Sequence, residues 1–383
     1  MPFQKGKRIE SMKFLVAGSG FTGAVIAREL VDQMDCEVDI TEERDHLGGN
    51  CHTARDQNTG VMVHAYGPHI FNTDDRETWD YVNRYGRFIP YVNRVKSVTK
   101  QGIFSLPINL HTINQFFGKT MNPEEARVFV GRLGVKTNHE PRNFEEQALK
   151  MIGEELYEAF YKGYTYKQWG CSPQDLPSSI FNRLPIRFDY NDNYYNKAFQ
   201  GIPEEGYTNV IQNILEHPRI NLSLNTPVLA DQISPNYQHV FWTGPLDRFF
   251  HYSQGILGYR TLEFEKIVAN GDYQGNAVMN YPARETPFTR ILEHKHLAPW
   301  ESHSTTIVFR EYPKEAQEGD IPFYPKRLER DLVVLGKYQQ QARSLSGVSF
   351  HGRLGNYRYM DMEAVIREAR LAATNFMLRK KNG

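Results

Sequence analysis

The sequence predicts an α/β protein with a Rossmann-like dinucleotide-binding domain, an inserted helical bundle and an antiparallel β-sheet domain. Three observations support this prediction. Residues 13–30 have the pattern of a strand, a glycine-rich loop and a helix, residues 79–177 show mainly helical periodicity, and residues 258–312 alternate in short β-like runs. A chain of 383 residues is longer than one compact core usually needs, so two or three structural units are expected.

The first unit opens with a glycine-rich loop. Residues 14–17 are apolar and predict a strand, Gly18, Gly20 and Gly23 follow at G-x-G-x-x-G spacing, and an apolar pattern predicts a helix to about Leu30. A loop of this kind places backbone N–H groups and a helix N-terminus against a pyrophosphate. The pattern therefore predicts a dinucleotide site.

The segment after this helix narrows the choice of dinucleotide. Residues 37–41 predict a second strand that ends at Glu42, about 20 residues beyond the glycines, where a ribose-binding carboxylate is expected. The following "RDHLGGN" carries Arg44, Gly49 and Asn50, a basic residue and a Gly-Gly turn that are typical of FAD proteins. Soluble NAD dehydrogenases usually continue straight into a helix at this point. A simple glycine hairpin is the alternative interpretation.

Helical patterns dominate the next part of the chain. Residues 122–134 predict a short helix and residues 143–170 a longer one, with Asn143 and Glu146 spaced as a capping pair and Gly153 dividing it. Residues 170–188 are rich in Gly, Pro and Ser and predict a flexible loop that carries Arg183 and Arg187. We interpret this part as a helical domain inserted into the first fold.

The remaining sequence returns to strands and a final helix. A helix is predicted to begin within residues 200–215, strands near residues 220–228 and 239–244, and a strand, glycine turn and helix over residues 348–377. The sequence thus predicts four units. A disordered extension covers residues 1–11, and the FAD-binding domain covers residues 12–78, 201–244 and 326–383. The helical domain covers residues 79–182 with a mobile loop at 170–188, and the antiparallel sheet domain covers residues 183–200 and 245–325.

Composition excludes several classes of protein. With 45 basic and 45 acidic residues the net charge is zero, so a nucleic-acid partner is not expected. The three cysteines are scattered, which favours a reduced cytoplasmic protein, and neither an apolar run of about 20 residues nor a signal-peptide pattern is present, so no membrane association is expected. Although His294 and His296 could share a strand face, the sequence does not support a metal site.

Motifs in fixed order connect the chain to a known family. They include "GSGFTGAVIARELV", "RDHLGGN", "VHAYGPHIFNTD", "KGYTYKQWG", "LPIRFDYNDNYYN", "PFTRILEHK", "DIPFYP" and "GRLGNYRYMDM". From residue 13 to about residue 377 the sequence resembles bacterial UDP-galactopyranose mutases. The resemblance implies a cytoplasmic homodimer that interconverts UDP-galactopyranose and UDP-galactofuranose and supplies galactofuranose for a surface polysaccharide.

The resemblance also implies an unusual use of the cofactor. FAD is active only when a cellular reductant has reduced it. Its N5 then acts as nucleophile on the anomeric carbon, expels UDP and forms a flavin–sugar iminium, so the reaction is covalent catalysis without net redox change.

The resemblance assigns roles to individual residues. Arg183 and Arg290 are expected to hold the UDP diphosphate, and His69 to lie beside the flavin ring, as catalytic residues. The expected substrate-binding residues are Phe160, Tyr164, Thr165, Trp169, Tyr194, Tyr324 and Tyr359. The expected cofactor-binding residues are Gly18, Gly20, Phe21, Thr22, Gly23, Glu42, Arg44, Gly49, Asn50, His69, Gly352, Arg353, Asp361 and Met362.

Purely structural roles are an alternative for several of these residues, and the sequence departs from the family pattern at two positions. Phe160 and Tyr164 could be core residues, His69 a satisfied core histidine, and Asp361 a helix cap. The family often has a histidine where this sequence has Asn72, and a tyrosine where it has Phe323; neither replacement can supply the lost titratable group or hydroxyl. The competing functions are the same chemistry on UDP-N-acetylgalactosamine, a flavin amine-oxidase-like oxidoreductase, and a non-enzymatic FAD-binding protein.

Overall fold

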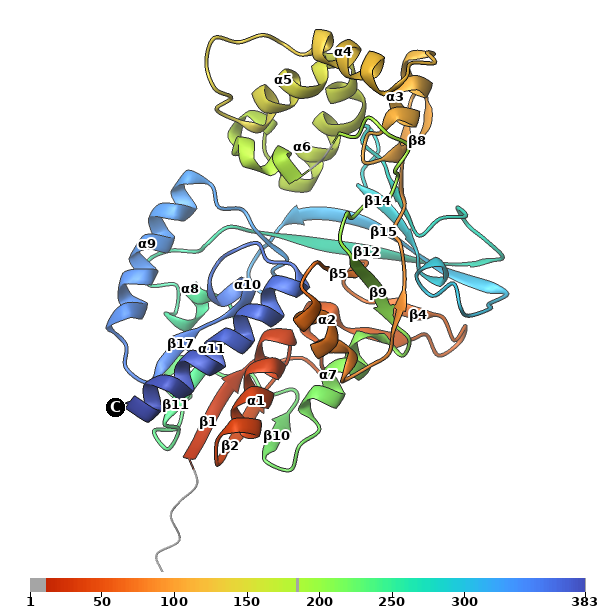
Figure 1. Cartoon of the computed structure of the whole chain (residues 1–383). Coiled ribbons are helices and arrows are strands. Elements are labelled where there is room, and N and C mark those ends of the chain that lie inside the picture. Colours follow the sequence, from red (N-terminus) through yellow and green to blue (C-terminus); the bar gives the residue numbers. More distant parts are fainter. Residues whose placement is uncertain (1–11, 184–185, 383) are drawn as a thin grey trace, which may run out of the picture.

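A parallel sheet forms the first unit of the protein. The computed structural model describes residues 12–183 and 186–382, and Figure 1 shows their arrangement. The sheet has the strand order β10-β2-β1-β11-β17, and every neighbouring pair is parallel. Its strands are β1 (Met12–Ala17), β2 (Cys36–Thr41), β10 (Ile220–Ser223), β11 (His239–Trp242) and β17 (Val348–Phe350). The predicted strands of the first unit and its Rossmann-like fold are thereby confirmed.

Three helices cover this sheet and share its core. α1 (Phe21–Gln33) packs against α7 (Gly206–Leu215) and α11 (Met362–Asn382). The core combines strand residues such as Phe14 and Phe241 with helix residues such as Ile26, and all three side chains are almost completely buried. The predicted helix after the glycine loop is present and begins at Phe21.

A seven-stranded sheet forms the second layer. Its order is β16-β12-β15-β14-β13-β7-β8, and all pairs are antiparallel except β13 with β7. Its strands are β7 (Val95–Thr99), β8 (Gly102–Leu106), β12 (Tyr259–Asn270), β13 (Val278–Asn280), β14 (Arg290–Glu293), β15 (Thr305–Glu315) and β16 (Tyr324–Pro325). The antiparallel sheet predicted over residues 258–312 is confirmed.

A helical lobe stands above this sheet in Figure 1. It contains α3 (Leu110–Phe117), α4 (Pro123–Leu133), α5 (Phe144–Tyr157), the π-helix η2 (Glu158–Lys162), α6 (Gly163–Trp169) and the 3₁₀ helices η3 (Pro173–Asp175) and η4 (Ser178–Arg183). The side chain of Asn143 accepts a hydrogen bond from Glu146 N at 2.9 Å and so caps α5. The carboxylate of Glu146 accepts from Arg142 N instead of completing the predicted box. Gly153, with φ 75° and ψ 173°, divides the helix as predicted.

The domain boundaries predicted from the sequence differ from the structure at residues 79–106. Helix α2 (Arg76–Asn83) is followed by β6 (Phe88–Pro90), β7 and β8, so the prediction that this part is mainly helical is wrong. Strand β9 (Phe199–Pro203) was also missed; it pairs with β5 (Phe71–Thr73) and β6 in a three-stranded sheet. These strands are short; β6, β7 and β9 pair with distant segments, whereas β8 pairs with β7 in a local hairpin.

The helical lobe and the seven-stranded sheet share one core. Phe144 and Phe160 from the lobe pack in the same buried cluster as Val278, Leu292 and Phe309 from the sheet. The other elements are β3 (Thr53–Arg55), β4 (Met62–His64), α8 (Leu246–Phe249), α9 (Glu329–Ser344), α10 (Gly352–Gly355) and the 3₁₀ helices η1 (Gly49–Cys51), η5 (Ala230–Gln232) and η6 (His294–Leu297).

Two remaining expectations concern termini and membranes. The extension predicted over residues 1–11 lies outside the described residues. Within residues 12–183 and 186–382, none of the helices combines the length and the apolar character needed to cross a bilayer.

Candidate functional site

One cavity of about 2000 Å³ connects the three parts of the molecule. Its walls come from the carboxyl ends of β1 and β2, from the helical lobe, and from the seven-stranded sheet. Ligands of open α/β sheets bind at such carboxyl ends. The cavity extends from the glycine loop, at Gly18 and Gly20, to Tyr164 and Arg290. Residues far apart in sequence therefore face one space.

The glycines of the loop serve two different purposes. Gly18 has φ +108°, and a Cβ there would lie 2.3 Å from Thr243 Oγ1. A Cβ on Gly23 would lie 2.0 Å from Gly18 O, so this glycine allows α1 to pack on β1. A Cβ on Gly20 would meet its nearest described atom, Gly49 Cα, only at 3.9 Å. Gly18 and Gly23 are thus required by packing, whereas Gly20 leaves room for a ligand against the backbone.

Glu42 is held rigidly at the end of β2. Its side chain is buried, and Oε2 accepts hydrogen bonds from Ser19 N at 2.9 Å and Ser19 Oγ at 2.8 Å. Oε1 accepts from Arg44 N at 3.0 Å. The carboxylate lines the cavity beside the glycine loop. Its position and orientation suit a ribose hydroxyl, which would donate to a remaining lone pair.

The turn after Glu42 offers donors for a charged ligand. Gly48 and Gly49 have φ of +98° and +53°, and the Arg44 guanidinium lies 4.8 Å above the Tyr66 ring. Arg44 Nη2 donates to Asn50 Oδ1 at 2.9 Å, while Nη1 is buried without a hydrogen-bond partner among the described residues. An unpaired buried N–H on a cavity wall fits a phosphate oxygen. The donor set therefore fits a dinucleotide pyrophosphate.

His69 is half-buried and is connected through backbone N–H groups to two buried histidines, His64 and His294. Its backbone N–H donates to His64 Nδ1 at 3.1 Å, and His64 N donates to His294 Nδ1 at 3.2 Å. Burial lowers the pKa of His69 to about 4 and that of His294 to about 3, and it lowers the pKa of His64 as well. His69 Nδ1 lies 2.8 Å from Gly67 O, which assigns the proton to Nδ1 and leaves Nε2 as an acceptor. His69, which lines the cavity, is therefore a neutral imidazole near pH 7.

His294 and His296 do not act as a pair. His294 is occupied by the bond from His64, whereas His296 Nε2 lies 3.1 Å from Asp272 and 3.5 Å from Glu293. The three side chains Asp272, Glu293 and His296 lie close enough to hold an ion. However, the Glu293 carboxylate already accepts the backbone N–H groups of residues 273, 274 and 275. This arrangement stabilises a turn of the chain.

Arg290 provides a fixed positive charge on the opposite wall. It is the first residue of β14, its side chain is 19% exposed, and Nε lies 2.8 Å from Oε1 of the fully buried Glu311. Burial disfavours the charged guanidinium, but the Glu311 carboxylate outweighs this effect and raises the pKa of Arg290. Tyr164 and Tyr324 lie close enough to interact electrostatically with the guanidinium. A guanidinium that is already held in place by an ion pair can bind an anion without reorganising.

The helix α6 and the preceding π-helix form an aromatic wall. Phe160, Tyr164, Thr165 and Trp169 all line the cavity. Phe160 also packs against Phe104 and Phe116, with both ring centroids at 5.5 Å. The functional interpretation and the core interpretation of Phe160 are therefore compatible.

Tyrosines close the cavity on the side of α11. The rings of Tyr324 and Tyr359 stack with centroids 6.2 Å apart, and the Arg353 guanidinium lies 5.9 Å and 5.2 Å from them. Arg353 donates to the carbonyls of Phe323 and Met360, both at 3.1 Å, so its guanidinium holds the two tyrosine-bearing segments together. Both tyrosines line the cavity, so the stacked pair forms part of its wall.

Of the other residues that were expected to bind the cofactor, four line the cavity and Gly352 serves packing. Phe21, Thr22, Asp361 and Met362 line the cavity, and Asp361 Oδ1 also caps α11 by accepting from Ala364 N at 2.9 Å. Gly352, with φ +74°, packs against Thr22, where a Cβ would lie 2.5 Å from Oγ1. Gly352 therefore serves the packing of α10 on α1.

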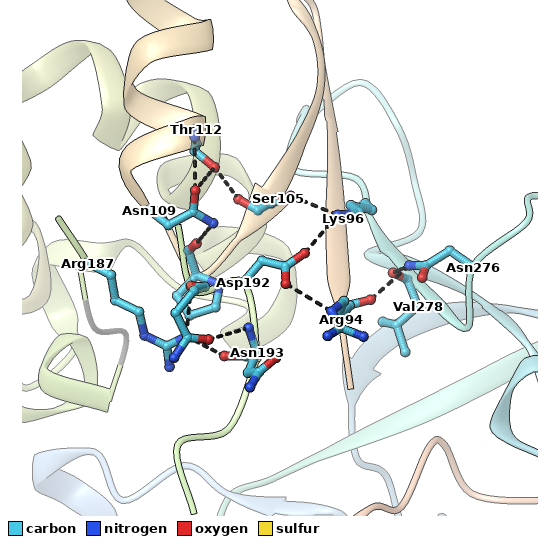
Figure 2. A network of polar contacts seen from close by, with 12 residues as sticks. Arg94, Lys96, Ser105, Asn109, Thr112, Arg187, Asp192, Asn193, Asn276 and Val278 are labelled. Atoms are coloured by element: carbon cyan, nitrogen blue, oxygen red, sulfur yellow. Dashed lines mark hydrogen bonds and ion pairs between the residues drawn. The ribbon is translucent and has the colours of Figure 1, made fainter. Parts of the chain in front are cut away.

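The end of the predicted mobile loop and the segment after it are anchored beside β7 (Figure 2), and Leu110 N at the start of α3 donates to Asp189 O at 2.9 Å. Asp192 binds Arg94 at 2.9 Å and Lys96 at 3.4 Å. The Arg187 guanidinium donates to Asn191 O at 3.1 Å and Asn193 O at 2.5 Å. The anchored segment leads directly into Tyr194, which lines the cavity.

The two arginines of the predicted loop are thereby distinguished. Arg187 is buried and bound to the backbone of its own segment. The backbone of Arg183 ends η4, and its side chain lies outside the described part of the structure.

Further cavity residues were not found from the sequence. Tyr66, His46, Tyr195 and Lys197 also line the cavity, and His46 Nε2 lies 2.7 Å from Tyr66 OH. Tyr66, His46 and Tyr195 lie within motifs quoted above but were not singled out, and Lys197 directly follows one of them. The two departures from the family pattern lie here too: Asn72 lines the cavity and donates to Ile70 O at 3.1 Å, and Phe323 is buried against Tyr66 and Phe264.

Comparisons with known proteins agree with this geometry. A family model described as UDP-galactopyranose mutase matches residues 159–359, and one described as an NAD(P)-binding Rossmann-like domain matches residues 16–85. A Klebsiella pneumoniae protein named "Probable UDP-galactopyranose mutase" is 51% identical over 369 residues, 96% of each chain. An Escherichia coli dTDP-fucopyranose mutase is 46% identical and covers 93% of this chain and 96% of its own.

A solved structure shows the same fold. The crystal structure of a reduced UDP-galactopyranose mutase superimposes with a TM-score of 0.75 at 15% sequence identity, covering 96% of this chain and 94% of that one.

Proposed function

The chain belongs to the UDP-galactopyranose mutase family, and on that premise we propose that it interconverts UDP-galactopyranose and UDP-galactofuranose with FAD as its cofactor. The observation that carries the proposal is the single cavity in which the glycine loop and Arg290 both lie. One end has the donors for a dinucleotide, and the other has a half-buried cation and tyrosines for the diphosphate of a nucleotide sugar.

The residues of the glycine loop support FAD as the dinucleotide. Glu42 would bind the adenosine ribose, and the unpaired Arg44 Nη1 and the backbone at Gly20 and Gly49 would hold the pyrophosphate. When bound and reduced, the flavin supplies a nucleophilic nitrogen for the anomeric carbon of the sugar. His69 would present a neutral Nε2 acceptor to the flavin ring, because its Nδ1 proton is directed to Gly67 O.

The other wall would position the nucleotide sugar. Arg290, pinned by Glu311, would bind the diphosphate in the ground state and stabilise the charge that develops on it as it leaves the sugar. Tyr324 and Tyr359 would donate hydrogen bonds to the same phosphates, and Phe160 and Tyr164 would contact the uridine. We propose Arg183 as a second diphosphate ligand, delivered by a segment that closes over the substrate and excludes water.

The cellular setting of the reaction belongs to the same proposal. It comprises a cytoplasmic homodimer, a cellular flavin reductant, and a surface polysaccharide that receives the furanose. The scattered cysteines and the family resemblance support it.

The Escherichia coli relative favours a second candidate substrate. Its name specifies a dTDP-fucopyranose mutase, and its identity of 46% is close to the 51% of the Klebsiella pneumoniae relative. The same ring contraction on a dTDP-linked 6-deoxysugar would use the same diphosphate ligands. UDP-N-acetylgalactosamine stays a further variant of the substrate. An amine-oxidase-like reaction would have no use for the diphosphate ligands.

The test is a chromatographic assay of the purified yellow protein, with and without dithionite. UDP-galactofuranose, UDP-N-acetylgalactofuranosamine and dTDP-fucofuranose are supplied separately. We expect conversion of UDP-galactofuranose to the pyranose only after reduction. Conversion of dTDP-fucofuranose alone would identify the second candidate. Consumption of an amine with production of hydrogen peroxide, and no ring isomerisation, would contradict the mutase proposal.

A further inference from the structure

Helix α6 has two functional faces. Tyr164, Thr165, Gln168 and Trp169 line the cavity. Gly163, Tyr166 and Lys167, spaced i, i+3 and i+4, lie on the opposite face of the helix. This opposite face contacts the loop of residues 281–289, which joins β13 to β14.

The contact between the helix and this loop is close. A Cβ on Gly163 would lie 2.2 Å from Pro282 O, so only glycine permits the approach. The Arg284 guanidinium stacks on the Tyr166 ring at 4.0 Å. Between these two contacts lies the side chain of Lys167.

The Lys167 ammonium is enclosed by four backbone carbonyls of the loop. Nζ lies 2.6 Å from Tyr281 O, 2.9 Å from Ala283 O, 2.9 Å from Thr286 O and 2.8 Å from Phe288 O. An ammonium has three N–H groups, so four acceptors must share them. The loop therefore surrounds a positive charge, in the way that rings of carbonyls surround K⁺ in channels.

The loop leads directly into Arg290, the first residue of β14 and a proposed ligand of the diphosphate. Thr289 N donates to Glu311 O at 2.9 Å, and the next residue, Arg290, pairs with the Glu311 side chain. Lys167 thus connects the backbone of the helix that carries Tyr164 and Trp169 with the backbone that carries Arg290. A displacement of about 1 Å between such groups can reduce catalysis about a hundredfold.

A separate contact holds the end of α6. Arg260 from β12 donates to Gln168 O at 2.9 Å and Lys167 O at 3.0 Å, and it pairs with Glu315 at 3.2 Å. The helix terminus is therefore capped independently of the Lys167 side chain. Removing the ammonium should loosen the loop without unfolding the helix.

We infer that Lys167 is a positioning residue whose ammonium acts as a tethered cation at the centre of the 281–289 loop and fixes Arg290 relative to Tyr164 and Trp169. The inference rests on the proposed function, because the groups it aligns are the proposed ligands of the nucleotide sugar. The site would accept another monovalent cation if the lysine side chain were shortened.

The test compares Lys167→Ala with the wild-type holoenzyme. Lys167→Ala should keep its FAD and its thermal stability close to wild type, bind UDP more weakly, and lose about a hundredfold in kcat/KM. Propylammonium, which replaces the atoms removed from lysine, should restore both UDP binding and kcat/KM, and K⁺ should do so in part. Lys162→Ala is the control, because Lys162 pairs with Glu158 at the surface of the same helical stretch. It should behave as wild type and not respond to propylammonium.

The outcomes separate the inference from the proposed function. Wild-type kcat/KM and UDP affinity in Lys167→Ala would overturn the inference. Equal losses of FAD, stability and activity without rescue would also overturn it, since they would show a merely structural role. If the wild type converts no nucleotide sugar, the proposed function fails, and Lys167 is then judged by UDP affinity and its rescue alone.

Discussion

The two ends of the cavity are built in different ways. At the glycine-loop end, Ser19, Glu42 and Arg44 come from one continuous strand–helix–strand stretch, and backbone conformation and backbone N–H groups provide much of the site. At the other end, Arg290, Tyr324 and the residues of α6 come from distant segments and act through their side chains. The first end should therefore be sensitive to an added Cβ, and the second to a lost charge or a lost partner.

The largest expected effect concerns the charge at the second end. Arg290→Ala should lower kcat about 10²–10³-fold, the typical cost of losing a donor to the developing transition-state charge. It should also destabilise the fold by about 3–5 kcal/mol, because the buried Glu311 would be left unpaired. Steady-state kinetics and chemical denaturation of the holoenzyme measure the two effects.

A double variant separates them. Arg290→Ala with Glu311→Gln should recover much of the stability and none of the activity, since the uncompensated charge is gone but the ligand is still missing. Arg310→Ala, an arginine of β15 paired with Glu265 at the surface, is the control and should remain active. Full activity in Arg290→Ala would remove this residue from the site.

The next effect contrasts two glycines of the loop. Gly23→Ala would place Cβ 2.0 Å from Gly18 O and 2.9 Å from Val16 Cγ1, so it should destabilise the protein by about 1–3 kcal/mol and reduce FAD content. Gly20→Ala has space and an ordinary φ of −72°, so it should keep apo-protein stability and lose FAD affinity.

Thermal melts of apo and FAD-loaded protein, together with flavin absorbance, measure this contrast. Unchanged FAD affinity in Gly20→Ala would show that the ligand does not approach the backbone there.

The smallest effect concerns the linked histidines His64, His69 and His294, of which His69 lines the cavity. A buried neutral histidine binds no proton while its unfolded counterpart does, so its contribution is complete above pH 6.5 and is lost as the pH falls toward 4. Stability should therefore decrease below pH 6.5. Each histidine contributes a slope of about 1.4 kcal/mol per pH unit.

His294→Asn tests this slope. Its Oδ1 can still accept the hydrogen bond of His64 N, but it cannot titrate. Denaturation at pH 7, 6 and 5 should show a shallower loss of stability than in the wild type. An identical slope in the two proteins would contradict the assignment of His294 as a neutral buried histidine.

Local features of the fold were predictable from the sequence. Strand β1, the glycine loop, helix α1 and strand β2 follow from periodicity and glycine spacing within 30 residues. The cap at Asn143 and the break at Gly153 likewise depend on interactions within one or two helical turns. Strands β6 and β9 were not predicted, because these short strands pair with each other across more than 100 residues. Strands β7 and β8 form a local hairpin that was missed, and β7 also pairs with the distant β13.

The residues of the candidate site likewise divide into those that the sequence predicted and those that only the structure revealed. Motifs carried by the family resemblance named Tyr164, Trp169 and Arg290, and all three line one cavity. Lys167 lies in the same motif as Tyr164 and Trp169, but the sequence assigned it no role, because the four carbonyls that enclose it belong to a loop more than 100 residues away. Arg187 looked like a loop arginine in the sequence, yet it is buried against the backbone of its own segment.

The sequence by itself determined the family, the dinucleotide fingerprint and the local conformations at its glycines, because these depend on residue type and short spacing. Only the tertiary structure decided which sheet β7 and β8 join, which atoms surround Lys167, and that Arg290 is pinned by Glu311. The physical reason is that hydrogen bonds to backbone carbonyls and buried ion pairs depend on where distant segments meet. Local sequence carries little information about which distant segments come into contact.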